Sequence, residues 1–245
     1  MRQVLVDRLA LAAVALTLWV ALELRLGPDI LPGPLETGLR LLGLLADPAF
    51  QDEIASTLGA FALAALLAAS LGLMLGAALG TLPRTSDLLE PFLVGFYALP
   101  KVTLYPTVLL LLGVGLDAKV AFGALHGIVP VALFTAGGIR GLPPILAKSA
   151  RTLGLARVAT VTRVLLPAAL PEILAGLRIG LALTLLGTLI GEMFAARSGL
   201  GSVLMRAIPR LDNATVLSVT ILFLAGALLV DWTLERATRR SAAGR

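Results

Sequence analysis

Six long apolar segments occupy most of this chain. They cover approximately residues 9–24, 55–82, 91–112, 120–139, 168–193 and 214–231. Each is close to the length of about 20 apolar residues that a helix needs to cross a bilayer. Hydrophobic residues make up 58% of the 245 residues and charged residues only 14%, too little polar surface for a soluble domain. The sequence therefore predicts an all-α, polytopic membrane protein with six transmembrane helices.

The first apolar segment, 9–24, has a second interpretation as part of a signal peptide. No clean small-residue cleavage site follows it, and five further apolar segments do. We therefore interpret it as a retained span. The expected organisation is a single transmembrane domain. It consists of a first span and outer loop (1–50), the core spans (52–231), a loop at 143–166 within them, and a basic tail (232–245).

Basic residues predict the direction of the spans. With the N-terminus inside, two basic residues fall within spans, and the inner side holds most of the 20 Lys and Arg residues. The outer side keeps Arg25, Arg40, Lys119, Arg197, Arg206 and Arg210. Because short inner loops of membrane proteins are enriched in Lys and Arg, both termini are expected in the cytosol.

Composition also limits the possible classes of site. The chain has no cysteine and a single histidine, which argues against disulfides, thiolate metal sites and histidine metal clusters. A net charge of +5 in so apolar a chain does not indicate nucleic-acid binding. It also has no G-x-x-x-x-G-K-[ST] phosphate loop, so we expect no ATP hydrolysis by this chain.

Small residues recur at every fourth position in two spans. Gly72, Gly76 and Gly80 belong to such a stripe in 55–82, and Gly176 and Gly180 begin another in 168–193. Such stripes let helix backbones approach closely, so these glycines are expected at helix contacts. The alternative explanation is a high general content of glycine, 25 of 245 residues.

Polar and helix-breaking residues inside the spans are candidates for a translocation path. Proline interrupts a helix, and irregular backbone at membrane depth is tolerated where protein or a water-filled cavity surrounds it. An ionisable residue inside a span points to function. The candidate path or gate residues are Pro100, Lys101, Tyr105, Pro106, His126, Arg178, Thr184, Thr188 and Glu192.

These candidates also have structural interpretations. Lys101 could extend to the inner interface or pair with Glu90 or Glu192. Arg178 could pair with Glu172 on its own helix. The aromatic and histidine candidates could simply pack in the interior.

The loop between the fourth and fifth segments is basic and free of acid. Pro143 and Pro144 suit the first turn of a helix, and Gly154 can end that helix in a left-handed conformation. A second helical run follows, and Pro167 opens the next span. A short helix is therefore expected across the cytosolic face. Because it is tied to a span at both ends, pushing it would move both spans.

The residues of this loop resemble the EAA motif of the inner-membrane permease subunits of bacterial ABC importers. That motif reads Glu-Ala-Ala, three residues, Gly, nine residues and Ile-x-Leu-Pro. The spacing from Gly154 to Pro167 fits without a gap, although Lys148 replaces the motif's Glu. The candidate ATPase-coupling residues are Lys148, Ser149, Ala150, Arg151, Gly154, Val164, Leu166 and Pro167.

The resemblance extends from about residue 52 to residue 231 and favours the nitrate/sulfonate/taurine branch of these permeases. It is carried by Leu99-Pro100-Lys101, Leu104-Tyr105-Pro106, Gly113-Val114-Gly115, Leu166-Pro167-Ala168, Gly176-Leu177-Arg178-Ile179-Gly180, Glu192-Met193 and Ser198-Gly199-Leu200-Gly201. It implies a type I ABC importer permease fold in the bacterial cytoplasmic membrane.

The same resemblance implies partners. The loop would be a coupling helix that enters a groove on a cytosolic ABC ATPase dimer, which would bind the ATP and Mg²⁺. A second permease copy and a periplasmic or lipid-anchored substrate-binding protein complete such an importer. The implied substrate is a small anion of the sulfonate, taurine or nitrate type, with a thiamine precursor as the alternative.

Rival interpretations remain at this stage. An ion-gradient-driven secondary carrier often shows repeated halves and intramembrane acids, but no convincing internal repeat is present here. A membrane scaffold without transport activity is a further alternative, and the broken third span argues against it. The basic loop could also lie on membrane lipid. Its Gly and Leu-Pro spacing does not follow from lipid binding.

Overall fold

The structure is a computed structural model that describes residues 2–195 and 197–243. Every regular element in this part of the chain is a helix, so the predicted all-α class is confirmed. The helices are α1 (Arg2–Leu26), α2 (Pro34–Ala46), α3 (Pro48–Thr81), α4 (Pro83–Ala98), η1 (Lys101–Leu104), α5 (Tyr105–Leu112), α6 (Leu116–Arg140), α7 (Pro144–Thr152), α8 (Arg157–Thr160), η2 (Val161–Leu165), α9 (Leu166–Ala168), α10 (Leu170–Ala195), α11 (Leu200–Ala207), η3 (Ile208–Arg210) and α12 (Asn213–Ala243).

Four helices of the described residues are long and apolar enough to cross a membrane, namely α3, α6, α10 and α12. The bent pair of α4 with η1 and α5 makes a fifth candidate. The first predicted span lies within α1, whose first side chains are partly outside the described residues, and it stays a prediction. The predicted basic tail continues α12 to residue 243, but its side chains from 237 onward lie outside the described part.

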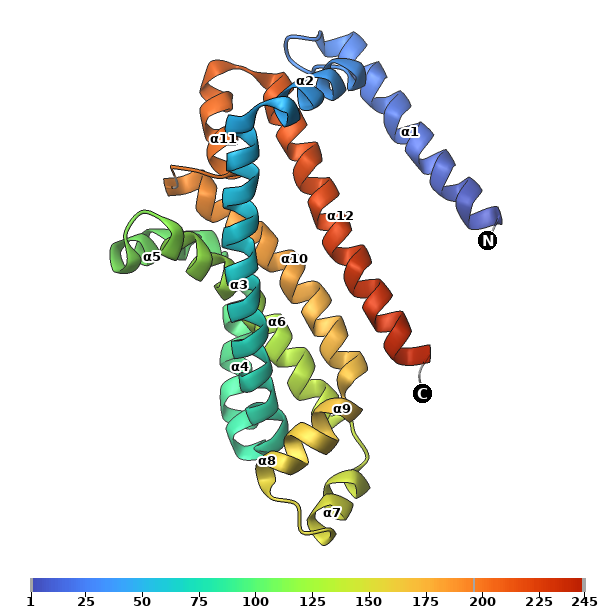
Figure 1. Cartoon of the computed structure of the whole chain (residues 1–245), viewed down its shortest axis with the longest axis vertical. Helices are drawn as coiled ribbons and strands as arrows, with labels where there is room; N and C mark the ends of the chain where they lie inside the picture. The colour runs from blue at the N-terminus through green and yellow to red at the C-terminus, as the bar shows by residue number, and fades with distance from the viewer. Residues whose placement is uncertain (1, 196, 244–245) are drawn as a thin grey trace.

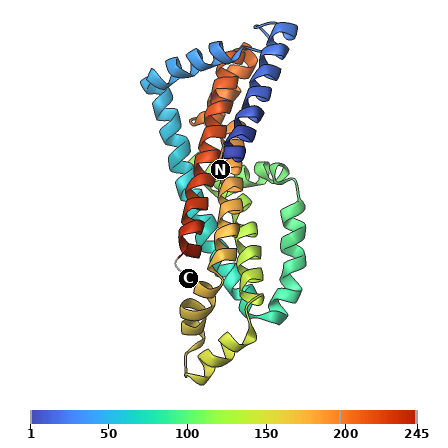
Figure 2. The ribbon, with the colours of Figure 1, turned by 90° about the vertical axis from the view of Figure 1, so that its right-hand side faces the viewer.

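The long helices run along one axis of an elongated molecule (Figure 1). The loop helix α7 lies at one end, and α2 and α11 lie near the other. The view turned by 90° shows the same arrangement, with the loop at the foot of the bundle (Figure 2). The predicted loop helix is thus confirmed at the end of two spans, α6 and α10.

Glycines join α3, α6 and α10 into one tightly packed unit. A Cβ atom on Gly72 would lie 2.6 Å from Cβ of Val131, and one on Gly76 would lie 2.5 Å from Cβ of Thr135. Real Cβ atoms do not approach so closely, so only glycine allows this helix contact. The same holds for Gly80 against Ile139, Gly176 against Phe134 and Gly180 against Val131. All five predicted packing glycines therefore lie at helix contacts.

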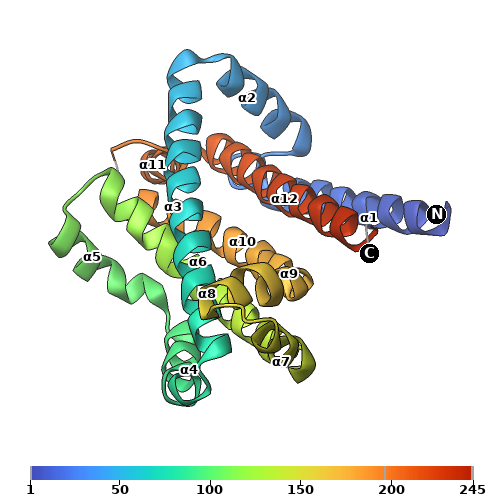
Figure 3. The ribbon, with the colours of Figure 1, turned by 60° about the horizontal axis from the view of Figure 1, so that its bottom comes forward.

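The third predicted span is broken near its two inner prolines. α4 ends at Ala98, a short 3-10 turn follows Pro100, and α5 begins at Tyr105 with Pro106 in its first turn. α4 and the segment from η1 to α5 meet at an angle of 94°. In Figure 3, α5 lies on the side of α3 opposite α12, and α4 lies at the foot of the picture. α4 begins at Pro83, ahead of the predicted start of the span at Pro91, which lies inside the helix.

Candidate functional site

The loop between α6 and α10 presents a short helix with an exposed outer face. On α7, Lys148, Ser149 and Arg151 are exposed, whereas Ala150 is buried and faces the rest of the loop. Ile145 is an apolar residue on the same helix, and 62% of its surface is exposed. The helix is anchored through Ala150 and through Ala147, which packs against the core at the ends of α6 and α10, and its polar and apolar outer face is free within this chain.

Gly154 ends α7 as the sequence predicts. Its φ of +72° is in the left-handed region that favours glycine. The amide of Leu155 donates to the carbonyl of Ala150 at 3.1 Å, and the amide of Gly154 donates to Arg151 at 3.0 Å. These bonds close the end of the helix in the manner of a Schellman motif. The cap turns the chain sharply toward α8.

The second half of the loop returns to the bundle through η2 and α9. Leu165 is buried against Ile139 of α6 and Ile173 of α10, whereas Val164 and Leu166 are half-buried. Pro167 lies in α9, one turn before α10 begins. Because Leu165 contacts both spans, a displacement of the loop reaches α6 and α10 directly. Contact with an ATPase remains a prediction for all eight loop residues.

A buried ion pair lies far from this loop, where α6 begins and α10 ends. Nζ of Lys119 donates to Oε1 of Glu192 at 3.2 Å, and both side chains are almost completely buried. The sequence places Lys119 on the outer side, just before the fourth span, and the structure places it in the first turn of α6, which begins at Leu116. A pairing of Glu192 with Lys101 was one alternative, and the structure instead pairs Glu192 with a cation from α6.

The ion pair is completed by groups from two other helices. The hydroxyl of Thr57 on α3 donates to Oε2 of Glu192 at 2.8 Å, and the amide of Gly201 on α11 donates to the same oxygen at 3.1 Å. Lys119 also donates to the hydroxyl of Ser56 at 2.9 Å. We call Ser56, Thr57, Lys119, Glu192 and Gly201 the buried polar centre. It joins α3, α6, α10 and α11, as a buried charge pair requires if it is to be satisfied.

Lys101 is held within its own segment. Its ammonium donates to the carbonyl of Tyr97 at 3.1 Å and lies 5.0 Å from the centre of the Tyr97 ring and 5.7 Å from that of Phe96. The alternative pairings with Glu90 or Glu192 are therefore wrong. Glu90 instead bonds to Arg140 of α6 and to Ser86. Lys101 keeps its place beside the break at Pro100, where a path role stays a prediction.

Tyr105 and His126 belong to the interior between the break and α10. The Tyr105 hydroxyl donates to the carbonyl of Gly191 at 2.6 Å, and its ring contacts Phe122 edge-on at 4.8 Å between centroids. Nδ1 of His126 lies 2.9 Å from the carbonyl of Phe122. Both side chains are buried. Tyr105 fixes the first turn of α5 against α10, and His126 bonds within α6.

Thr184 and Thr188 face α6 from α10 and are completely buried. Each hydroxyl donates to a carbonyl of its own helix, Gly180 or Thr184, at 2.9 Å. Their other neighbours are Gly127 and Gly123, on which a Cβ atom would overlap or crowd these hydroxyls. The two threonines are thus placed at a helix contact.

Arg178 lies lower on α10 and pairs with α12. Its guanidinium forms an ion pair with Asp231, and about two-fifths of each side chain is exposed. The alternative pairing of Arg178 with Glu172 is wrong, because α12 packs alongside α10 and supplies Asp231 instead. The pair therefore links two candidate spans and lies apart from the buried polar centre.

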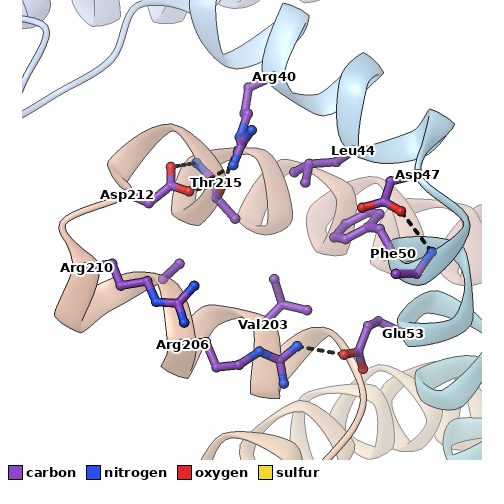
Figure 4. Close-up of a pocket in the computed structure, with 12 residues that line it drawn as sticks. Arg40, Leu44, Asp47, Phe50, Glu53, Val203, Arg206, Arg210, Asp212 and Thr215 are labelled. Carbon is purple, nitrogen blue, oxygen red and sulfur yellow. Dashed lines mark hydrogen bonds and ion pairs between the residues drawn. The ribbon is translucent and has the colours of Figure 1, made fainter.

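A pocket of about 230 Å³ opens at the end opposite α7, between α2, α3, α11 and α12. Figure 4 shows Arg40 and Asp212 on one side of it and Arg206 and Glu53 on the other. Arg40 donates to Asp212 at 2.9 Å, and Arg206 donates to Glu53 at 2.6 Å. Sequence reasoning missed this cluster because it treated the segment before α3 as a loop. An aspartate just ahead of an apolar helix, as Asp212 is, was the available signal.

The carboxyl of Asp212, which lines this pocket, has a pKa shifted from its ordinary value. Burial raises the pKa of its carboxyl, but bonds from the hydroxyl and amide of Thr215 and the charge of Arg40 outweigh burial. The pKa of Asp212 therefore lies below its ordinary value. Among the residues that the structure describes, no group of three His, Cys, Asp or Glu residues could hold a metal ion.

Comparison with known proteins gives a consistent result. The family model described as binding-protein-dependent transport system inner membrane component matches residues 68–242. The taurine transport system permease protein TauC of Escherichia coli strain K12 is 30% identical over 235 residues, which cover 93% of this chain and 86% of TauC. The putative aliphatic sulfonates transport permease protein SsuC of Bacillus subtilis strain 168 is 31% identical over 226 residues, covering 91% and 82%.

Solved structures share the fold at lower identity. A chain of the inward-facing MetNI methionine ABC transporter has a TM-score of 0.68 at 19% identity, and 77% of this chain and 94% of that chain are covered. A chain of an amino acid ABC transporter with histidines has a TM-score of 0.59 at 19% identity, covering 79% and 94%. The predicted importer permease fold is therefore confirmed.

Proposed function

This chain belongs to the family of binding-protein-dependent transport system inner membrane components, and we propose that it forms the path by which a small organic sulfonate crosses the membrane in an ABC importer. The single observation that carries the coupling part of this proposal is the loop helix α7. This helix lies at the end of α6 and α10, and the face that points away from the bundle is exposed. A separate cytosolic ATPase, which binds ATP and Mg²⁺, would dock on that face.

The packing of the core supports a route for the coupling. A force on α7 passes through Leu165 to α6 and α10, which glycine contacts hold together with α3. Such close-packed helices move as one body rather than deforming separately. At their far end lies the buried polar centre, which adds α11. A push on the loop would therefore shift both ends of the core relative to α4, α5 and α12.

The substrate class is supported by relatives rather than by a pathway residue. Both TauC and SsuC are named for sulfonates, and each covers most of this chain. Lys101 adds little, because Tyr97 and Phe96 already surround its ammonium. A sulfonate fits the proposal better than nitrate or a thiamine precursor on this ground.

The assembly would contain two copies of this chain, an ATPase dimer and a substrate-binding protein on the outer side. The basic loop of α7 and the predicted excess of Lys and Arg on its side favour a cytosolic position for α7 and for both termini. The outer pocket of Figure 4 would then face the binding protein.

Uptake by the reconstituted complex tests the proposal. The permease, its ATPase and its binding protein are placed in liposomes, and uptake of radiolabelled taurine and of an alkanesulfonate is measured with and without internal ATP. We expect uptake to need ATP and to persist when ionophores remove the proton and sodium gradients. Uptake that follows an ion gradient without ATP would favour a secondary carrier instead. A binding protein that delivers only nitrate or a cation would refute the sulfonate assignment alone.

A further inference from the structure

A large cavity lies between the loop and the ends of the spans, with a volume of about 810 Å³. Its apolar wall includes Ala77 and Ala78 at the end of α3, Ile139 at the end of α6, Ala147 of α7, and Val158 and Leu165 beyond it. The first three belong to helices that are apolar enough to span a membrane. The cavity therefore lies between the loop and the ends of two candidate spans.

The charged groups on the cavity are all positive. Arg140, Arg151 and Arg157 line it, and no acidic residue does so in the described part of the chain. Arg140 is bonded to Glu90 and Ser86. Arg151 donates only to the carbonyl of Ala147 at 3.3 Å, and Arg157 makes no hydrogen bond or ion pair among the described residues. Two guanidinium groups are thus free to bind an anion.

The charged and the apolar parts of the cavity lie in the same order as the headgroup and the acyl chain of a lipid. The guanidinium groups belong to the last residue of α6 and to the loop, whereas the alanine wall lies at the end of α3, a helix apolar enough to span a membrane. Arg157 is followed by Val158, which is 74% exposed although it is apolar. Basic pockets at the cytosolic ends of transmembrane helices are suited to anionic lipid headgroups.

We propose that this cavity binds an anionic phospholipid of the inner leaflet. Arg151 and Arg157 hold the phosphate of the headgroup, and an acyl chain lies against Ala77, Ala78 and Val158. The lipid then occupies the space behind the loop and links its position to the ends of α3 and α6. This inference rests on the membrane placement proposed above, but not on the substrate.

Other occupants fit the cavity less well. A small sulfonate would bind the guanidinium groups but leave the apolar wall exposed to water. An ATPase would approach the exposed face of α7, and two exposed apolar residues there, Ile145 and Leu153, do not line the cavity, although Val158 beyond α7 does. Neither explains why the cavity extends to the end of α3.

Lipid binding to the intact complex with its ATPase tests the proposal. The delipidated complex is titrated with vesicles of phosphatidylcholine containing fluorescent phosphatidylglycerol, and with vesicles of phosphatidylcholine alone. Arg151→Gln and Arg157→Gln are each expected to weaken retention of phosphatidylglycerol by roughly fivefold, since one basic residue near an anionic headgroup contributes about that factor. Arg163→Gln is the matched control, because Arg163 is an exposed arginine of the same loop that does not line the cavity.

A second variant tests the apolar part of the cavity while leaving its charged part unchanged. Ala78 is exposed, so Ala78→Phe is expected to fold and to fill the apolar part while every arginine remains. It should also lower retention of phosphatidylglycerol. Equal losses in Arg163→Gln would mean that only general surface charge attracts the lipid, and would overturn the proposal. Failure of the ATPase-containing complex to bind any lipid, or displacement of the lipid by taurine, would overturn the proposal in favour of those occupants. Taurine uptake is measured separately, so failure here leaves the transport proposal standing.

Discussion

The ammonium nitrogen of Lys119 lies 3.2 Å from a carboxylate oxygen of Glu192, and neither side chain reaches solvent. One residue begins α6 and the other ends α10. Thr57 and Gly201 satisfy the second carboxylate oxygen. The pair therefore fixes four helices at the end of the molecule opposite the loop.

Removing one charge of this pair should destabilise the protein strongly. Glu192→Gln leaves the Lys119 ammonium buried without a counter-charge, which costs about 3–5 kcal/mol. The midpoint of thermal unfolding of the purified permease measures this loss. Asp231→Asn is the control, since it breaks the half-exposed pair with Arg178 and should cost about 1 kcal/mol or less. Equal midpoints for the two variants would contradict the role given to the buried polar centre.

Gly199 should tolerate no side chain, for two separate reasons. Its φ is +109°, and a Cβ atom there would overlap the carboxylate of Glu192. Gly199→Ala should therefore lower the unfolding midpoint by more than Gly113→Ala. Gly113 also has a positive φ, +74°, but a Cβ atom there would have no neighbour within 4 Å. The control should lose only the backbone term of about 1–2 kcal/mol, and the difference between the variants reports the steric contact with Glu192.

The arrangement of the core follows from local sequence patterns. A four-residue stripe that includes Gly72 and Gly76 already predicts a close helix contact, because spacing along one helix fixes which face is small. The end of α7 at Gly154 is equally local, since a left-handed cap needs only the residues beside it. Predictions of this kind are confirmed.

Partners of charged residues could not be predicted in the same way. Lys119 precedes the predicted fourth span by one residue, and nothing local shows that α6 begins earlier and buries it. Its partner Glu192 is 73 residues away, and Asp231 is 53 residues from Arg178. Pairing over such separations depends on how the helices pack. The sequence offers several acids of equal merit for each cation.

The exposed apolar residue on α7 should matter for coupling and not for folding. Ile145 is 62% exposed, so Ile145→Asp should change the free energy of unfolding by about 0.5 kcal/mol or less. If α7 enters a groove on the ATPase, the same change should reduce co-purification of the ATPase at least about tenfold, because a charge would be buried there. Ile30→Asp is the control, with 65% exposure at the opposite end. Unchanged co-purification would place the ATPase contact elsewhere.

Acid should weaken the pocket opposite α7 through Asp212. Its pKa is lowered in the folded protein, because the bonds from Thr215 and the charge of Arg40 outweigh burial. Such a carboxyl stabilises the fold above its unfolded pKa of about 4, and this contribution is lost as the pH falls through the folded pKa. Asp212→Asn keeps a side chain able to cap α12 but removes the charge.

The measurement is the unfolding midpoint between neutral pH and about pH 3. The acid-induced decrease should be smaller in Asp212→Asn than in the wild type, by no more than about 1 kcal/mol because both partners are part-exposed. Asp52→Asn, on an exposed aspartate of α3, should leave the wild-type decrease intact. A decrease unaltered by Asp212→Asn would mean that other carboxyls account for it.

The chain has two tyrosines, and they offer a matched test of the break before α5. Tyr105 is buried and donates to the carbonyl of Gly191 at 2.6 Å. Tyr105→Phe keeps the ring contact with Phe122 but leaves that carbonyl without this donor, which should cost about 1–3 kcal/mol. Tyr97 is 40% exposed, and Tyr97→Phe should cost about 0.5 kcal/mol or less. If Tyr105 also acts as a gate, Tyr105→Phe should change the rate of uptake by more than its unfolding midpoint explains. A normal uptake rate at a lowered midpoint would leave Tyr105 a purely structural residue.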